Sequence, residues 1–79
     1  MNYDLLWSKV LKKIKPEVTS VVYLTWFENT RLYKIEDNTA IIIVPMEIHR
    51  KHLNEIYLDK IVGTLASETN QIYDISFNY

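Results

Sequence analysis

Residues 30–45, with the sequence TRLYKIEDNTAIIIVP, decide the fold of this 79-residue chain. The pair Asp37-Asn38 predicts a tight turn, because both side chains tolerate left-handed backbone and bond to nearby backbone groups. Residues 30–36 have an extended pattern. Residues 39–44 are almost continuously apolar, which is typical of a strand covered on both faces. Pro45 then ends the strand. Two strands joined by a short turn predict a β-hairpin, whose second strand is expected to be central or covered.

Helical spacing dominates the sequence before the hairpin. Apolar side chains recur at intervals of three and four from about Tyr3 to Ile14, which predicts a first helix. This helix should end at Lys15, because the residue before a proline avoids the helical region. A second helix is predicted from Pro16 to Phe27, since proline suits the first helical position. This second segment is rich in β-branched residues, so a strand is the alternative.

The periodicity changes twice after the hairpin. Residues 46–66 return to helical spacing, with a break near Leu58. From Tyr73 to Tyr79 every second residue is apolar, which predicts a half-buried strand. The expected order is therefore α-α-β-β-α-β, an α+β fold with a three-stranded sheet covered by helices on one face. A chain of this length is expected to form a single domain over residues 1–79.

Composition limits the classes of function. The chain has nine Lys and Arg against ten Asp and Glu, a net charge of −1, whereas a duplex-binding module is usually strongly basic. There is no cysteine, so no disulfide or thiolate metal site is expected, and a reducing, intracellular setting fits. The single glycine cannot build a glycine-rich phosphate loop. No apolar stretch approaches the ~20 residues of a membrane span.

Metal binding and catalysis find little support in the side-chain pattern. His49 and His52 are followed by Glu55 at a spacing that can place metal ligands on one helix face. However, Arg50 and Lys51 would repel a cation, and no fourth ligand is apparent. Solvated histidines are therefore favoured over a metal site. Since no nucleophile motif is present either, the chain is not expected to be an enzyme.

Both tryptophans allow two interpretations. Trp7 lies on the apolar side of the first predicted helix, as either a core residue or a partly exposed interface anchor. Tryptophan is rarely fully buried and is enriched at binding hot spots. Trp26 and Phe27 are adjacent on a predicted helix, so their side chains point about 100° apart. One of these two is therefore expected in the core and the other partly exposed.

Several short motifs, in this order and spacing, resemble one protein family. They are Leu6-Trp7, Thr25-Trp26-Phe27, Asp37-Asn38-Thr39, Pro45 followed by Ile48, and Tyr57-Leu58. Over essentially its whole length the chain resembles the N-terminal domain, domain I, of the bacterial chromosomal replication initiator DnaA. The resemblance implies a KH-like fold and a cytoplasmic fragment of a longer chain. ATP would bind only in a separate ATPase domain, so no cofactor is expected in these residues.

The resemblance also implies a docking module with two surfaces and no membrane partner. Self-association of the initiator is assigned to Trp7, with Leu6 and Val10 beside it. The second surface, expected to bind the replicative helicase and regulators of initiation, comprises Val22, Thr25, Trp26, Met46 and Ile48. Members of the family carry an acid, an asparagine and a phenylalanine at the positions of Val22, Met46 and Ile48. This surface is thus more apolar here than in the family pattern.

A lysine cluster in the first predicted helix raises a further possibility. Together with aromatic neighbours, Lys9, Lys12 and Lys13 could follow a phosphate backbone and give weak, salt-sensitive contact with single-stranded DNA. The alternative is a solvated helix face, the commoner meaning of so short a run. The chain lacks the Gly-x-x-Gly loop with which KH domains hold nucleic acid. A docking module is therefore the first functional hypothesis, and a single-strand binder the second.

Overall fold

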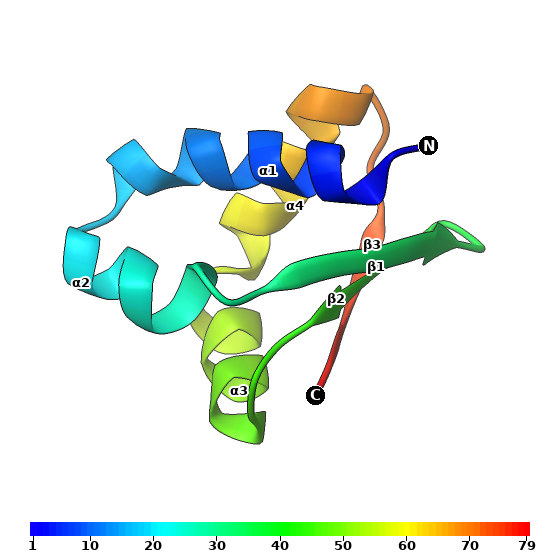
Figure 1. The fold of residues 1–79 in the computed structure, drawn as a ribbon. Coiled ribbons are helices and arrows are strands. Elements are labelled where there is room, and N and C mark those ends of the chain that lie inside the picture. The colour runs from blue at the N-terminus through cyan, green and yellow to red at the C-terminus, as the bar shows by residue number, and fades with distance from the viewer.

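The computed structural model describes all 79 residues as a three-stranded sheet with helices on one of its faces (Figure 1). This arrangement confirms the expected α+β class. Two short elements are not α-helices: η1 is a 3-10 turn and η2 a π-helical turn. The elements in chain order are α1 (Tyr3–Ile14), η1 (Lys15–Glu17), α2 (Ser20–Val22), η2 (Tyr23–Phe27), β1 (Arg31–Glu36), β2 (Thr39–Ile43), α3 (Glu47–Ile56), α4 (Leu58–Thr69) and β3 (Asp74–Asn78).

The predicted hairpin forms around Asp37 and Asn38. Their φ angles of 51° and 62° are both positive, and two successive left-handed residues match the twist of the flanking strands. Asp and Asn are among the few residues that adopt this conformation readily. The strands β1 and β2 pair antiparallel, with one bulge at Tyr33. The turn is therefore confirmed, and its two residue types explain it.

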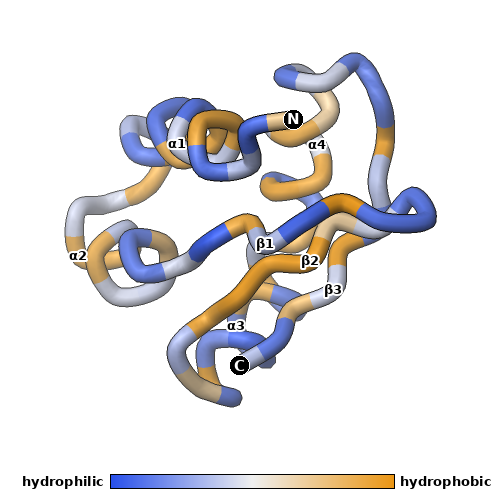
Figure 2. The backbone as a smooth tube through the Cα atoms, turned by 45° about the vertical axis from the view of Figure 1, so that its right-hand side comes forward, coloured by the Kyte–Doolittle hydropathy of each residue, from blue (hydrophilic) through white to orange (hydrophobic).

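Strand β2 lies in the centre of the sheet, antiparallel to β1 and parallel to β3. A parallel neighbour requires a long crossover connection, which α3 and α4 supply. Figure 2 shows that β2 is hydrophobic along most of its length. Ala40 and Ile42 are buried beneath the helices, whereas Ile41 and Ile43 on the opposite face are partly exposed. The strand is therefore central, as expected, but covered on one face only.

The first helix has the predicted bounds. Asn2 caps α1, because its side chain accepts a hydrogen bond from the amide of Leu5. The α-helix ends at Ile14 as expected, but Lys15 before the proline keeps helical angles, φ −49° and ψ −47°, and the chain continues into η1, so the proline rule does not explain this boundary. The helix lies beside α4 and β1 (Figure 1). The side chains that it buries are Trp7, Val10 and Ile14.

The predicted second helix, over residues 16–27, is not continuous. After the 3-10 turn η1, Val18 is extended, with φ −129° and ψ 166°. A new helix then begins, because the Thr19 side chain accepts a hydrogen bond from the amide of Val22 at 3.1 Å. A threonine at this position is a strong helix start. The interruption corrects the prediction of one helix, and the strand alternative is also wrong.

The second helix widens at its end into the π-helical turn η2. The amide of Glu28 bonds to the carbonyl of Tyr23, five residues earlier, at 3.0 Å. Such turns are rare in proteins, but those that occur are often found at functional sites. Phe27 in this turn is fully buried, whereas Trp26 is only partly buried. The prediction that these neighbours divide between core and surface is thus confirmed.

The third predicted helix, over residues 46–66, is two helices. α3 and α4 meet at Tyr57, whose φ −116° and ψ 8° are not helical, so the predicted break near Leu58 is confirmed. Ile48 and Ile56 belong to the apolar residues whose helical spacing predicts this segment, but their side chains are 58% and 61% exposed. Neither helix of the pair, nor any other, is long and apolar enough to cross a membrane. The residues that these two helices bury are Leu53, Ile61 and Leu65.

Candidate functional site

Two segments that are distant in the sequence, η2 and the first turn of α3, lie side by side (Figure 1). Between them they carry the residues that the sequence predicts for partner docking. Thr25 is exposed, and Met46 and Ile48 are 56% and 58% exposed. Val22 and Trp26 are partly buried, packed against the core. We call this set the Trp26 surface: Val22, Thr25, Trp26, Met46 and Ile48.

Trp26 is held in place by two imidazole rings. The His52 ring stacks on it at 3.9 Å between centroids and an interplanar angle of 19°. The His49 ring meets it edge-on at 5.2 Å and 66°. Ile48 lies one helical turn before His52 on the same side of α3, so it extends the surface beyond the stack. The aromatic group is therefore fixed by packing, with apolar side chains beside it.

His49 also ties the two segments together. Its Nε2 lies 3.0 Å from the carbonyl oxygen of Thr25, and because a carbonyl can only accept, Nε2 carries the proton and donates it. This carbonyl is one of the last in its helix, which lack partners within the helix. His49 Nδ1 is buried without a hydrogen-bond partner. The link thus fixes the tautomer of His49 and the position of η2 on α3.

The rings of His49 and His52, which the sequence places at a metal-ligand spacing, both pack against Trp26. No group of three His, Cys, Asp or Glu side chains is placed to share an ion. The expectation of solvated histidines does not include this support of Trp26, since both rings are partly buried against it. Two further exposed apolar residues, Val21 and Leu24, at 72% and 54%, are also absent from the predicted site. Only the run of apolar residues from 21 to 24 signals them.

The predicted self-association residues lie mostly in the core. Trp7 is 3% exposed and Val10 is fully buried, while Leu6 is partly buried. Trp7 Nε1 donates a hydrogen bond to Thr30 Oγ1 at 3.0 Å, which satisfies its only polar group. The structure therefore supports the core interpretation of Trp7 over that of a partly exposed anchor. The apolar side chain that α1 does expose is Leu5, at 53%.

The three lysines predicted to contact single-stranded DNA are neighbours on one side of α1, at i, i+3 and i+4 spacing. Their surroundings differ. Lys13 forms an ion pair with Glu68 and a 3.1 Å hydrogen bond with Ser67, both on α4. Lys12 lines an open groove, and Lys9 is exposed and forms no ion pair within 4.0 Å. Lys9 and Lys12 are therefore the members of the cluster that form no ion pair.

These features define a class: a small α+β domain that exposes an apolar surface across two helical segments, as protein-interaction domains do. A comparison with known families identifies the chain more closely. Residues 4–67 match the family model of the DnaA N-terminal domain. The chain belongs to this family, and the resemblance found in the sequence is confirmed. Membership gives it a role in the initiation of DNA replication.

Proposed function

We propose that this domain docks the replicative helicase, regulators of initiation, or both, through the Trp26 surface. The observation that carries the proposal is the exposed apolar group formed by Trp26, Met46 and Ile48 on two packed helical segments. Such side chains gain free energy when a partner removes them from water, roughly 1.5–3 kcal/mol for each one fully buried. Because His49 and His52 fix Trp26 beforehand, little ordering is needed on binding.

Family membership supports the proposal independently, since it places the chain in replication initiation. Val22, Met46 and Ile48 make this surface more apolar than the family pattern. The partner should therefore offer an apolar patch, with charge playing a smaller part than in relatives that carry an acid at the position of Val22.

The test is a titration of the isotope-labelled domain with the cognate helicase, followed by NMR. We expect shifts concentrated at the Trp26 surface. Combining Met46→Asp with Ile48→Asp should weaken binding by about tenfold or more, which is a loss of about 1.4 kcal/mol. Both positions are exposed, and Met46 is the N-cap residue of α3 without a side-chain cap bond, so two acids at the start of this helix should keep or slightly raise thermal stability.

Ile72→Asp is the matched control, because Ile72 is 73% exposed but lies before β3, outside the Trp26 surface. It also replaces an exposed apolar side chain with an aspartate, and it should leave helicase binding unaltered. Equal weakening by the control, or shifts located away from η2 and α3, would reject the proposal.

We further propose that copies of the domain self-associate through α1. Since Trp7 is buried, the contact would use Leu5 and the exposed part of Leu6, which lie on the outer side of the same helix. A single exposed leucine with a partly exposed neighbour offers a small area, so the association should be weak.

A further inference from the structure

Four of the nine Lys and Arg side chains form ion pairs within 4.0 Å, and the other five do not. Lys13, Lys34, Arg50 and Lys60 each form an ion pair with a nearby carboxylate. The hydrogen bond that Lys34 donates to the Glu36 carboxylate raises the pKa of Lys34 above its ordinary value. In contrast, three other cations form no ion pair within 4.0 Å and line one groove: Lys12, Lys15 and Arg31.

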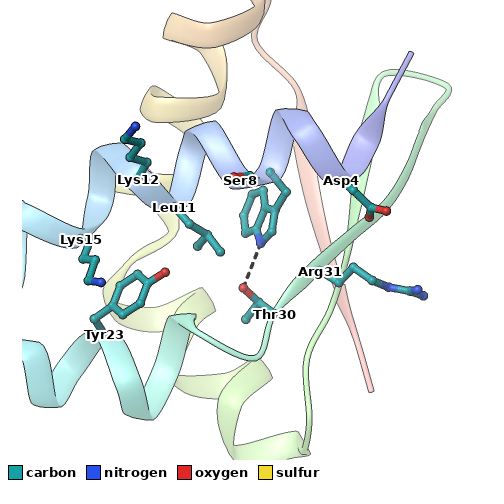
Figure 3. Close-up of a pocket in the computed structure, with 9 residues that line it drawn as sticks. Asp4, Ser8, Leu11, Lys12, Lys15, Tyr23, Thr30 and Arg31 are labelled. Carbon is teal, nitrogen blue, oxygen red and sulfur yellow. Dashed lines mark hydrogen bonds between the residues drawn. The ribbon is translucent and has the colours of Figure 1, made fainter.

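This groove runs between α1 and the segment from η2 to the start of β1 and has a volume of about 450 Å³ (Figure 3). Leu11 contributes apolar surface to its wall. The Tyr23 hydroxyl points into the space between the two segments (Figure 3), and it forms no hydrogen bond within the domain. Lys12 and Arg31 are exposed, and in Figure 3 both point away from the space between the two segments, but such long side chains can turn toward a bound anion.

The aromatic rings at the groove are already engaged. The Tyr23 ring stacks with Phe27 at 6.4 Å between centroids, and Lys15 Nζ lies over it at 5.2 Å from its centroid. The Trp7 indole is buried and its N–H is bonded to Thr30. Single-strand binding depends on free aromatic faces that stack with bases. The groove therefore offers cations, a hydroxyl and an aliphatic wall, but no free platform for a base.

We propose that this groove binds an acidic peptide segment of a partner protein. Lys12, Lys15 and Arg31 would hold its carboxylates, and Leu11 would contact an apolar side chain between them. Carboxylates suit these donors, and pairs with ionised groups are stronger than neutral hydrogen bonds. The site is distinct from the Trp26 surface, because none of its lining residues belongs to that set.

Asp4 supplies a sensitive test, because it is the only acid in the groove lining. Its carboxylate must repel an acidic ligand at the end of the groove where Arg31 lies (Figure 3). Asp4→Asn should therefore tighten binding by about twofold to fivefold at low salt, where exposed charges are least screened. Damage to the fold cannot produce such a gain.

The experiment uses fluorescence anisotropy with a labelled octapeptide that has two central leucines flanked by glutamates. The combined variant Lys12→Glu with Arg31→Glu should weaken its binding by about tenfold or more, as for close charge pairs at interfaces. Tyr23→Phe, which removes only the free hydroxyl, should weaken it by about twofold to fivefold. Circular dichroism would verify that each variant is folded.

Lys51→Glu is the control, since Lys51 is exposed on α3, away from the groove, and forms no ion pair. It changes the net charge by the same amount per site and should alter the affinity by less than about twofold. An equal loss with this control would show attraction to overall charge and overturn the proposal. An oligothymidylate that binds more tightly than the peptide, and loses binding in the groove variants, would assign the groove to nucleic acid instead.

Discussion

At the residue scale, the burial of Trp7 is the clearest difference between expectation and structure. Helical spacing places Trp7 on the same side of α1 as Leu11, but periodicity does not distinguish the centre of a buried stripe from its edge. Its indole N–H requires a partner to be buried. That partner, Thr30, is 23 residues away in sequence, and only the packing of α1 on β1 brings it close. Its position therefore could not be derived from the local pattern.

The first prediction follows from this hydrogen bond. Trp7→Phe keeps an aromatic ring in the core but removes the indole N–H and part of the volume. The free energy of unfolding should fall by about 1–3 kcal/mol. In a domain of this size each kcal/mol corresponds to roughly 4–8 °C in the melting temperature. Thermal unfolding followed by circular dichroism measures the change.

Leu5→Ala on the same helix is the control for this measurement. Because Leu5 is 53% exposed, its truncation should alter stability by no more than about 0.5 kcal/mol. An unchanged melting temperature for Trp7→Phe would mean that the indole is not buried in solution.

At the element scale, the sequence predicts which segments are helices and strands better than it predicts how the helices are divided. The hairpin and the break before Leu58 carry local signals, and each is confirmed. The interruption near Val18 also has a local signal, because Thr19 is a favourable N-cap residue. The helical spacing of the apolar residues on both sides of Thr19 hides this signal. The π-helical turn, which packs against α3, has no such local signal.

The second prediction concerns the link between η2 and α3. His49→Ala removes the hydrogen bond to the Thr25 carbonyl and the ring that packs against Trp26. We expect a loss of stability of about 1 kcal/mol and an affinity for the helicase about threefold to tenfold lower. The amide resonances of Thr25 and Trp26 should shift in the free domain.

His49→Gln supplies the matched comparison, because its side-chain amide can still donate to the Thr25 carbonyl. It should recover part of the lost affinity. If glutamine and alanine behave identically, the hydrogen bond does not position the Trp26 surface and the ring alone matters.

At the scale of the whole molecule, the expected class, strand number and sheet coverage are confirmed, while the KH-like label stays an expectation. The residues predicted for the candidate site also agree with the structure only in part. The structure brings the residues of the Trp26 surface together, as the family resemblance implies, but it pairs Lys13 with Glu68 and buries Trp7. Exposed apolar residues such as Met46 and Ile48 could be placed from motif positions. Burial and ion pairing depend on contacts between distant elements, so the sequence alone could not resolve them.

The third prediction concerns association between copies of the domain. Leu5→Asp places a charge on the only large apolar side chain that the body of α1 leaves more than half exposed. It should abolish any concentration-dependent increase in mass in sedimentation experiments, while the melting temperature stays within about 2 °C because the position is exposed. Met46→Asp, on the Trp26 surface, should leave this association intact. Association that survives Leu5→Asp would place the contact elsewhere.

The parallel pairing of β3 with β2 has a consequence for how the domain folds. β1 and β2 are joined by a two-residue turn. In contrast, both crossover helices lie between the paired residues Thr39 and Asp74 in the chain. Contacts between residues so distant in sequence form late, because closing a long loop costs entropy before any contact offsets it. The hairpin and α1 should therefore assemble first, with β3 added last. Amides of β3 should then exchange with solvent sooner than those of β2, so the carboxyl-terminal strand is the part of the domain that opens most readily.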